Sequence, residues 1–200
     1  RYVHLSTGNY TVNTARSYTD VDLLTCDEAF GADASSLFNL LTGYSVATIR
    51  EVFEQEATRP RWQRFVVAPF DYQRWLIDAI DREAKNAAAG REAKIVAKLN
   101  SLADPAVIRA LYAASSAGVK IDLFVRSICC LVPGLLGISA NIRVSSLVDR
   151  YLEHSRLFLF HNDGQPEVWA GSGDWMQRNF SRRIEVTWPI IDPKIRQRRI

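Results

Sequence analysis

Apolar positions in the first part of the chain change from a strand spacing to a helical spacing. The opening residues, RYVHLSTGNY, alternate in polarity, and Val21–Leu24 forms a second extended run. From about Asp27 the apolar residues follow the period of a helix, until Thr42-Gly43-Tyr44 interrupts the pattern. These periods predict two strands followed by a helix.

A further helix is predicted from Asp71, a candidate N-cap, to Gly90, because glycine commonly ends a helix. Leu76 and Ile80 share its apolar face. The residues before this helix, Arg59-Pro60-Arg61 and the following VVAPF, are interpreted as a linker.

A strand, a helix and a second strand form the clearest structural signal in the chain. Ile95–Leu99 reads as a strand, and Asp104-Pro105 combines an N-cap aspartate with a proline in the first helical position. Gly118 closes this helix, and the strand VKIDLFVR follows. A β-α-β unit of this length implies two parallel strands in one sheet.

The last part of the chain adds a predicted hairpin. The apolar runs RLFLF and EVWAG flank the turn signal Asn162-Asp163-Gly164. The preceding stretch, LVPGLLGISANIRVSSLV, is rich in glycine and proline at its start and is interpreted as a loop that faces a ligand. The pattern as a whole predicts an α/β fold with a mixed sheet flanked by helices.

Composition limits the classes of protein to consider. The 200 residues, 48% of them hydrophobic and 24% charged, suffice for one α/β domain or for a domain and part of another. A formal net charge of +3 is too small to indicate a nucleic-acid-binding protein. We expect no transmembrane segment and no secretion signal. Three cysteines without CxxC spacing fit a reduced cytoplasm.

Both ends of the chain indicate a longer protein. The sequence opens within a strand-like stretch without a methionine, and it stops within the basic segment DPKIRQRRI. We therefore expect the chain to be a fragment.

Two segments near the ends of the chain resemble each other. LSTGNYTVNTARSYTDV aligns without a gap with AGSGDWMQRNFSRRIEV, so that Thr7 falls on Ser172 and Asp20 on Glu185. In each segment a strand ends in small hydroxyl and glycine residues, which let the backbone approach a ligand. Strand ends rich in glycine are common, but the match along both segments favours a duplication with two related halves that face each other.

The second copy follows a histidine motif. His154-Ser155-Arg156 precedes an apolar strand and the GSGD turn, which is the layout of the phospholipase D superfamily. In that superfamily one histidine attacks phosphorus and its twin protonates the leaving group. The twin would belong to a His-x-Lys motif about twenty residues before Thr7, and the chain contains no His-x-Lys. We expect that motif upstream of Arg1.

Several blocks of sequence narrow the resemblance to one family. In chain order they are HLSTGNY, TARSYTD, LLTCD, DREAKNA, LYAASSAGVKIDLFVR, GISANIRVSSLVDRYLEHSR and SGDWMQRN. They resemble the histidine-phosphorylating polyphosphate kinases over nearly the whole chain. The resemblance implies the end of a first phospholipase D-like domain at 1–27, a helical connection at 28–70, and a second phospholipase D-like domain, truncated at its C-terminus, at 71–200.

The resemblance also implies an activity and its participants. The chain would be the C-terminal catalytic part of an enzyme that transfers the γ-phosphate of ATP reversibly to inorganic polyphosphate, through a phosphohistidine upstream of this chain. Mg²⁺ would be the cofactor, with its ligands also upstream and none in this chain. ATP, ADP and polyphosphate would be the partners, with no nucleic acid. The family further suggests a homo-oligomer and a cytoplasmic or peripheral membrane location, and we expect the fragment alone to be inactive.

Three residues receive roles from the resemblance. Tyr18 of TARSYTD would contact the nucleotide, and Arg126 at the end of LFVR would hold phosphate oxygens. His154 of YLEHSR would contact the nucleotide phosphates and act as a proton donor or charge partner at the leaving oxygen. Six further residues are expected to support the site: His4, Thr7, Asn9, Arg156, Ser172 and Asn179.

Structural roles compete with these assignments. Arg126 could be a solvated arginine at a strand end, although the β-α-β context favours phosphate binding. A lone histidine is more often structural, but Arg156 and the GSGD turn after His154 favour the site. For His4, a role in supporting the site and a role in packing are equally good interpretations. His161, next to a turn, is expected to be exposed.

Two other functions compete with the kinase. A phospholipase D-type phosphodiesterase or nuclease shares the paired motif, although it usually has lysine where this chain has Arg156. A non-catalytic polyanion-binding module is the alternative outside the enzymes. The residues upstream of Arg1 in the parent gene discriminate between enzyme and binding module, because only the enzyme needs a second histidine motif there.

Overall fold

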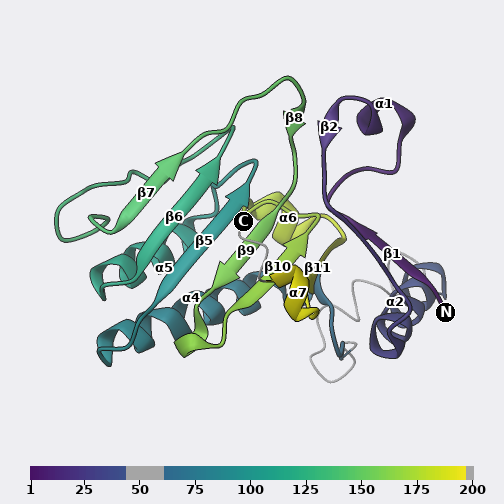
Figure 1. Ribbon diagram of the computed structural model, residues 1–200, viewed down its shortest axis with the longest axis horizontal. Helices are drawn as coiled ribbons and strands as arrows, with labels where there is room; N and C mark the ends of the chain where they lie inside the picture. The colour runs from purple at the N-terminus through teal and green to yellow at the C-terminus, as the bar shows by residue number, and fades with distance from the viewer. Residues whose placement is uncertain (44–60, 197–200) are drawn as a thin grey trace.

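A seven-stranded mixed sheet forms the larger part of the computed structural model, which describes residues 1–43 and 61–196 (Figure 1). The strand order is β4-β11-β10-β9-β5-β6-β7. The strands are β4 (Val66–Ala68), β5 (Lys94–Leu99), β6 (Lys120–Val125), β7 (Ile142–Ser145), β9 (Leu157–Phe160), β10 (Glu167–Gly171) and β11 (Glu185–Pro189). Strands β5, β6 and β7 are parallel, and the other neighbours pair antiparallel. The expected α/β class with a mixed sheet is confirmed.

The predicted β-α-β unit is confirmed as β5, α5 (Pro105–Ser116) and β6. The Asp104 carboxylate accepts the amides of Ala106 and Val107, both at 3.0 Å, and so caps the helix. Leu99 pairs with Val125 at the carboxyl ends of the two parallel strands. The residues that follow these two strands therefore emerge side by side at one edge of the sheet.

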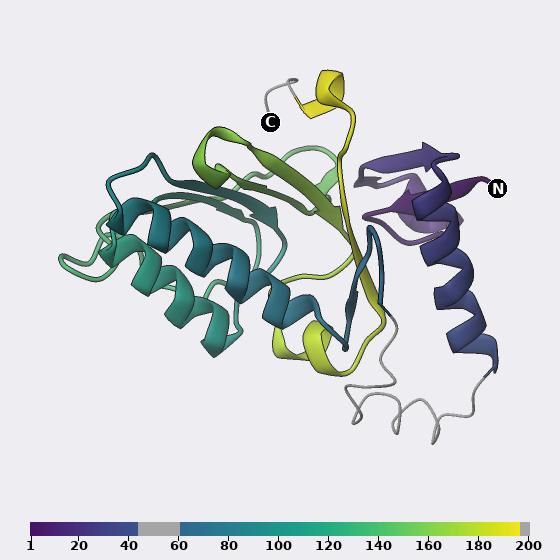
Figure 2. The ribbon, with the colours of Figure 1, turned by 90° about the horizontal axis from the view of Figure 1, so that it is seen from below.

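Helices α4 (Tyr72–Ala88) and α5 pack side by side on one face of the sheet (Figure 2). Leu76 and Ile80 of α4 are fully buried against it, as their spacing predicts. Asp71 is the N-cap residue of α4 as predicted, but its carboxylate makes no capping hydrogen bond and accepts from Arg74 Nη2 at 2.8 Å instead. Gly90 follows the helix with φ +74°, a conformation that favours glycine.

Two short strands lie in segments that we interpreted as loops. Val66–Ala68, within the expected linker, is the buried strand β4 and pairs with β11. Ile142–Ser145, within the expected ligand-facing loop, is the edge strand β7 and pairs with β6. Both are too short for a clear period, and proline or glycine stands nearby. The proposed boundaries at 27 and 70 stay a prediction, but the pairing of β4 joins residues 66–68 to the second unit.

The predicted hairpin is confirmed as β9 and β10, joined by η2 (Asn162–Gly164). Asn162 and Asp163 have φ values of 48° and 51°, in the left-handed region that suits such turn residues. His161 is partly buried and not exposed as expected, because its Nδ1 lies 2.9 Å from the Glu92 carbonyl.

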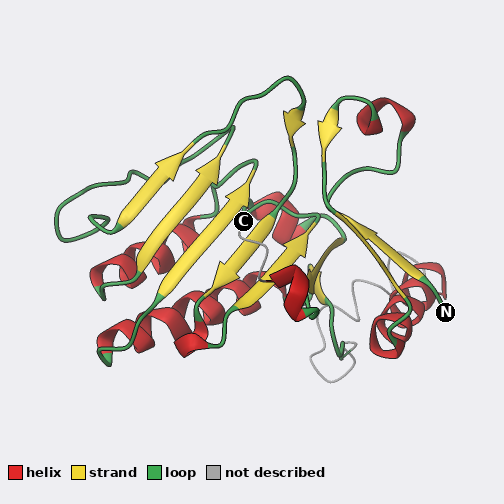
Figure 3. Cartoon of the chain, viewed as in Figure 1, coloured by secondary structure: helices red, strands yellow, loops and turns green. Residues whose placement is uncertain are grey.

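The first part of the chain forms a smaller unit beside the large sheet (Figure 3). It contains the two-stranded antiparallel sheet of β1 (Val3–Ser6) and β3 (Asp22–Thr25), with α1 (Val12–Ala15) between them, and then α2 (Glu28–Gly43). The predicted strands and helix are confirmed here. Residues 44–60 of the expected helical connection lie outside the described residues.

A cluster of buried hydrophobic side chains joins the first part of the chain to the large sheet. Phe30 and Leu37 of α2 pack in one cluster with Val67 of β4 and Trp188 of β11. In addition, the buried Asp33 carboxylate accepts backbone amides of residues 63–65 at 2.6 to 3.0 Å. The helix of the first part is therefore anchored to the start of the large sheet.

Candidate active site

His154 lies where the first and last parts of the chain meet. The residue is only 9% exposed. Its Nδ1 lies 3.0 Å and 3.2 Å from the two carboxylate oxygens of Asp20, and its ring packs against Tyr18 with the centroids 4.7 Å apart. A carboxylate and an aromatic ring from the start of the chain thus enclose this histidine.

A short parallel ladder produces this contact. Strand β2 (Tyr18–Thr19) pairs with β8 (Leu152–Glu153), and the two lie side by side at the top of the view in Figure 1, between the large sheet and the first part of the chain. Directly after β8, the amide of His154 donates to the carbonyl of Thr19 at 3.0 Å. Since Tyr18 and Asp20 flank Thr19, this backbone bond brings both side chains to the histidine.

The environment of His154 favours the neutral ring. Burial, and then the neighbouring positive charge of Arg156, lower the pKa of His154 from its ordinary value of 6.5, while Asp20 opposes them. Because the unfolded chain takes up this proton at a higher pH than the folded chain, the contribution of neutral His154 to stability is present above about pH 6.5. It is lost as the pH falls through the lower pKa of the folded state.

Replacing Asp20 with asparagine is expected to lower the pKa of His154 further. The carboxylate hydrogen-bonds the ring and attracts its positive charge, and both effects raise the pKa. NMR titration of the His154 ring protons measures the shift. Asp22→Asn is the matched control, because Asp22 lies 3.8 Å from His4 Nε2 and is paired with a different histidine. An unchanged or higher pKa in Asp20→Asn contradicts the prediction.

Arg156 is a buried anchor. Its Nε and Nη2 contact the two carboxylate oxygens of Asp174 at 3.3 Å and 3.1 Å, and both side chains are 8% exposed. Its Nη1 donates to the carbonyls of Thr7 and His154 at 2.8 Å and 3.1 Å. Arg156 therefore ties the turn after β1 to the strand entry that carries the histidine.

Arg126 follows the end of β6 and is less constrained. Its Nε donates to Asn100 Oδ1 at 2.6 Å. Its two terminal nitrogens make no hydrogen bond to any residue that the structure describes. The guanidinium keeps one double-donor edge, which is the geometry that binds phosphate oxygens.

The two repeated segments share their hydrogen bonds. In the first, the Thr7 hydroxyl donates to Asp20 Oδ1 at 2.7 Å and accepts the amide of Val21 at 3.0 Å. The Thr7 amide donates to the Val21 carbonyl at 3.0 Å. The carboxylate is thus held at the strand end by a hydroxyl.

In the second copy, Ser172 bonds Glu185 through its hydroxyl at 2.5 Å and accepts the amide of Val186 at 3.1 Å. Its own amide donates to the Val186 carbonyl at 3.0 Å. Asn179 donates to the other oxygen of Glu185 at 2.6 Å. The same three bonds therefore recur at the aligned positions, which supports the duplication inferred from the sequence.

Strand pairing repeats as well. Ser6 pairs with Asp22 between β1 and β3, and the aligned residues Gly171 and Thr187 pair between β10 and β11. Gly8 stands beside Asp20 in a place that a Cβ atom could not occupy, because it would overlap the carboxylate. A Cβ atom at the aligned Gly173 would lie 3.1 Å from the side chain of Glu185, so both the register and the close approach recur in the second copy.

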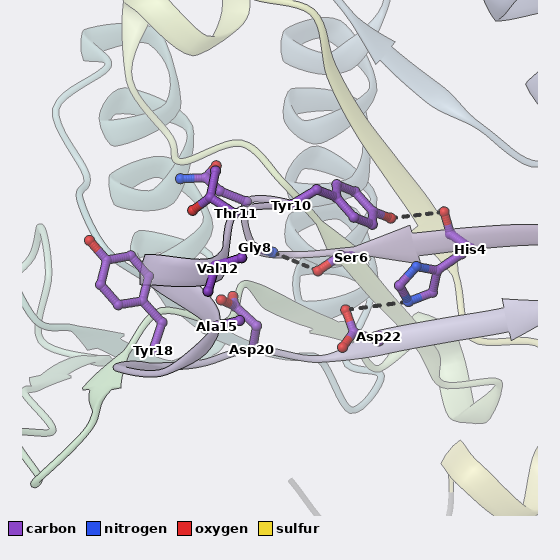
Figure 4. Close-up of a pocket in the computed structure, with 11 residues that line it drawn as sticks. His4, Ser6, Gly8, Tyr10, Thr11, Val12, Ala15, Tyr18, Asp20 and Asp22 are labelled. Carbon is purple, nitrogen blue, oxygen red and sulfur yellow. Dashed lines mark hydrogen bonds and ion pairs between the residues drawn. The ribbon is translucent and has the colours of Figure 1, made fainter.

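A cavity of about 570 Å³ opens along the first copy, and neither His154 nor Arg126 lines it (Figure 4). Tyr18 and Asp20, which contact the histidine, form part of its wall, and Val12 and Ala15 supply an apolar part. The predicted supporting residues His4 and Asn9 also line it. Ser172 and Asn179 do not line this cavity, and they bind Glu185 instead.

Comparison with known proteins assigns the family. Residues 65–199 match the model of polyphosphate kinase C-terminal domain 2, and residues 1–47 match C-terminal domain 1. The chain belongs to the polyphosphate kinase family.

Relatives in this family are similar to nearly the whole chain. The polyphosphate kinase of Synechocystis sp. is 49% identical over 98% of the chain and 25% of its own length. That of Neisseria meningitidis serogroup C is 47% identical over 99% of the chain and 27% of its length. The crystal structure of polyphosphate kinase from Porphyromonas gingivalis is 43% identical and superposes with a TM-score of 0.86, over 98% of this chain and 28% of that one. The chain therefore spans about a quarter of the length of the curated relatives.

The three residues that the sequence assigned to the site lie in one region. Tyr18 packs on His154, and Arg126 is close enough to His154 to lower its pKa. Sequence reasoning missed two buried side chains that connect them, Asn100 and Asp174. It also assigned no role to Asp20, although the alignment with Glu185 marked that carboxylate.

Side chains that commonly bind metals do not cluster in the described residues. Among residues 1–43 and 61–196, no cluster of three histidine, cysteine or acidic side chains could hold a metal ion. Within the same ranges, no helix has the length and apolar character needed to span a bilayer.

Proposed function

We propose that this chain is the C-terminal catalytic part of a polyphosphate kinase, which transfers the γ-phosphate of ATP reversibly to inorganic polyphosphate. The transfer proceeds through a phosphohistidine on a residue upstream of this chain, and the ligands of Mg²⁺ lie there too. The observation that carries the proposal is the pairing of His154 with Asp20 across the two repeated halves, next to the free edge of Arg126.

His154 serves the leaving oxygen. Asp20 accepts the Nδ1 proton, so Nε2, which lies 3.2 Å from Arg156 Nη1, is the ring nitrogen that serves the nucleotide phosphate. A lowered pKa makes a protonated ring a better proton donor, so that Nε2–H can pass its proton to the oxygen of the departing ADP when the phosphorus–oxygen bond breaks. In the reverse direction the neutral Nε2 accepts the proton from ADP.

Arg126 and Tyr18 hold the nucleotide around this histidine. The free edge of the Arg126 guanidinium binds phosphate oxygens and offsets the negative charge that grows on them during transfer. Tyr18 packs on the His154 ring and borders the cavity, so its ring orients both the histidine and the nucleotide.

The duplication assigns a carboxylate of the second half of the site the role that Asp20 has in the first half. Glu185 occupies the place that Asp20 has in the first copy, and it is buried and held by Ser172 and Asn179. We infer that Glu185 orients the upstream histidine as Asp20 orients His154. Each half thus supplies a carboxylate for the histidine of the other half.

The intact gene product incubated with Mg²⁺ and γ-labelled ATP tests this function. Long labelled polymer that an exopolyphosphatase degrades is the expected result. If the protein cleaves a phosphodiester and makes no polymer, the proposal is wrong and the protein is a phosphodiesterase. Binding of polyphosphate without any turnover would replace it by the polyanion-binding module. Oligomeric state and cellular location stay predictions from the family.

A further inference from the structure

We propose that Asn100 is a positioning residue, which holds the Arg126 guanidinium in the orientation that binds phosphate oxygens. The inference rests on the proposed function of the site. Asn100 is the first residue after β5 and Arg126 the first after β6, and the preceding residues Leu99 and Val125 are paired in the parallel register. The two side chains therefore emerge next to each other at the carboxyl edge of the sheet.

Hydrogen bonds fix the orientation of the Asn100 amide. Its Oδ1 accepts from Arg126 Nε at 2.6 Å. Its Nδ2 donates toward Asp174 Oδ2 at 3.4 Å and the His154 carbonyl at 3.5 Å. A flipped amide would place NH₂ against the Arg126 donor and its oxygen against two acceptors. Only one orientation satisfies this side chain, which is 4% exposed.

This fixed amide constrains the arginine. Binding of Nε to Asn100 aims the Nη1–Nη2 edge away from the amide, and those nitrogens make no hydrogen bond within the described part of the chain. A phosphate then meets a guanidinium whose orientation is already set, so less side-chain freedom is lost on binding. Asp174 also binds Arg156, so Asn100 connects the phosphate-binding arginine to the anchor of His154.

The variant Asn100→Ala tests the role of the side-chain amide separately from that of the backbone. The backbone amide of Asn100 donates to Asp174 Oδ1 at 2.8 Å, and its backbone carbonyl accepts from the Ser127 amide at 2.9 Å. A substitution retains both of these groups. Asn86→Ala is the matched control. Asn86 is 6% exposed and accepts from Arg91 Nη2 at 2.6 Å, at the end of α4.

The experiment is a double-mutant cycle in the intact gene product. Asn100→Ala, Arg126→Ala and the double variant are compared by kcat and KM for ATP in polymer synthesis with Mg²⁺. We expect Asn100→Ala to lower kcat/KM about 10- to 100-fold, because a buried hydrogen bond to a charged group is lost. In the Arg126→Ala background the same change should cost less than about threefold, since the residue through which Asn100 acts is absent.

Two kinetic outcomes would overturn the inference. One is an equal loss in both backgrounds, which indicates a general structural role, and the other is a loss no larger than that of Asn86→Ala. If Asn100→Ala does not fold, Asn100→Ser takes its place in the cycle.

Binding separates this inference from the proposed function. If the parent protein makes no polymer, the proposed function fails. In that case the affinity for tripolyphosphate, measured by calorimetry, tests the positioning role of Asn100. Weaker binding in Asn100→Ala than in Asn86→Ala then supports the positioning role, and equal binding overturns it. Polymer synthesis by the parent together with additive losses would leave the function in place and remove only the role of Asn100.

Discussion

Replacing His154 with alanine is expected to lower polyphosphate synthesis by about two to four orders of magnitude, the range for loss of a general acid. The imidazole is the group that Asp20 orients and that faces the leaving oxygen in the proposed transfer. Alanine removes the proton donor and opens the contact with Tyr18. Formation of labelled polymer from γ-labelled ATP and Mg²⁺ by the intact gene product measures the loss.

His161→Ala provides the control for removal of a histidine. Its ring contacts the Glu92 carbonyl beside the hairpin turn, at the far end of β9 from His154. We expect that variant to keep its rate within about threefold, since the contacts that are lost, to Glu92 and Gly164, lie at the surface and far from the site. Full activity in His154→Ala, or an equal loss in both variants, contradicts the assignment of His154.

Local signals account for the parts of the fold that the sequence predicts. Asp104-Pro105 starts a helix by capping and proline geometry, and Gly90 ends one by its positive φ, so these bounds need no tertiary information. Strands β4 and β7 escape prediction because three or four residues carry no clear period. Their pairing depends on partners far along the chain, and in β4 a proline directly follows the strand.

The residues of the site likewise divide into those that the sequence predicts and those that it does not. Tyr18, Arg126 and His154 belong to sequence blocks that resemble one family, so they could be assigned without a structure. Asn100 and Asp174 could not, because their roles arise from side-chain hydrogen bonds across 18 to 74 positions. Pairing of Asp20 with His154, 134 positions apart, depends on the β2–β8 ladder, which no local pattern indicates.

The Asp174 carboxylate is expected to contribute most to stability around the site. Asp174→Ala should reduce the free energy of unfolding by about 3 to 5 kcal/mol, because it leaves the guanidinium of Arg156 buried and without its counter-charge. Two backbone amides that donate to the carboxylate, those of Asn100 and Ser101, also lose their acceptor. Urea denaturation of the parent and the variant measures the difference.

Asp122→Ala is the matched control, since Asp122 also accepts from an arginine, Arg143, at 2.7 Å, but that side chain is 78% exposed. Exposed ion pairs contribute about 0 to 1 kcal/mol, so the control should cost far less. Adding Arg156→Met to Asp174→Ala should restore part of the stability by removing the unpaired charge. Equal costs of the two aspartate variants, or a further loss on adding Arg156→Met, would show that charge burial is not what makes Asp174 important.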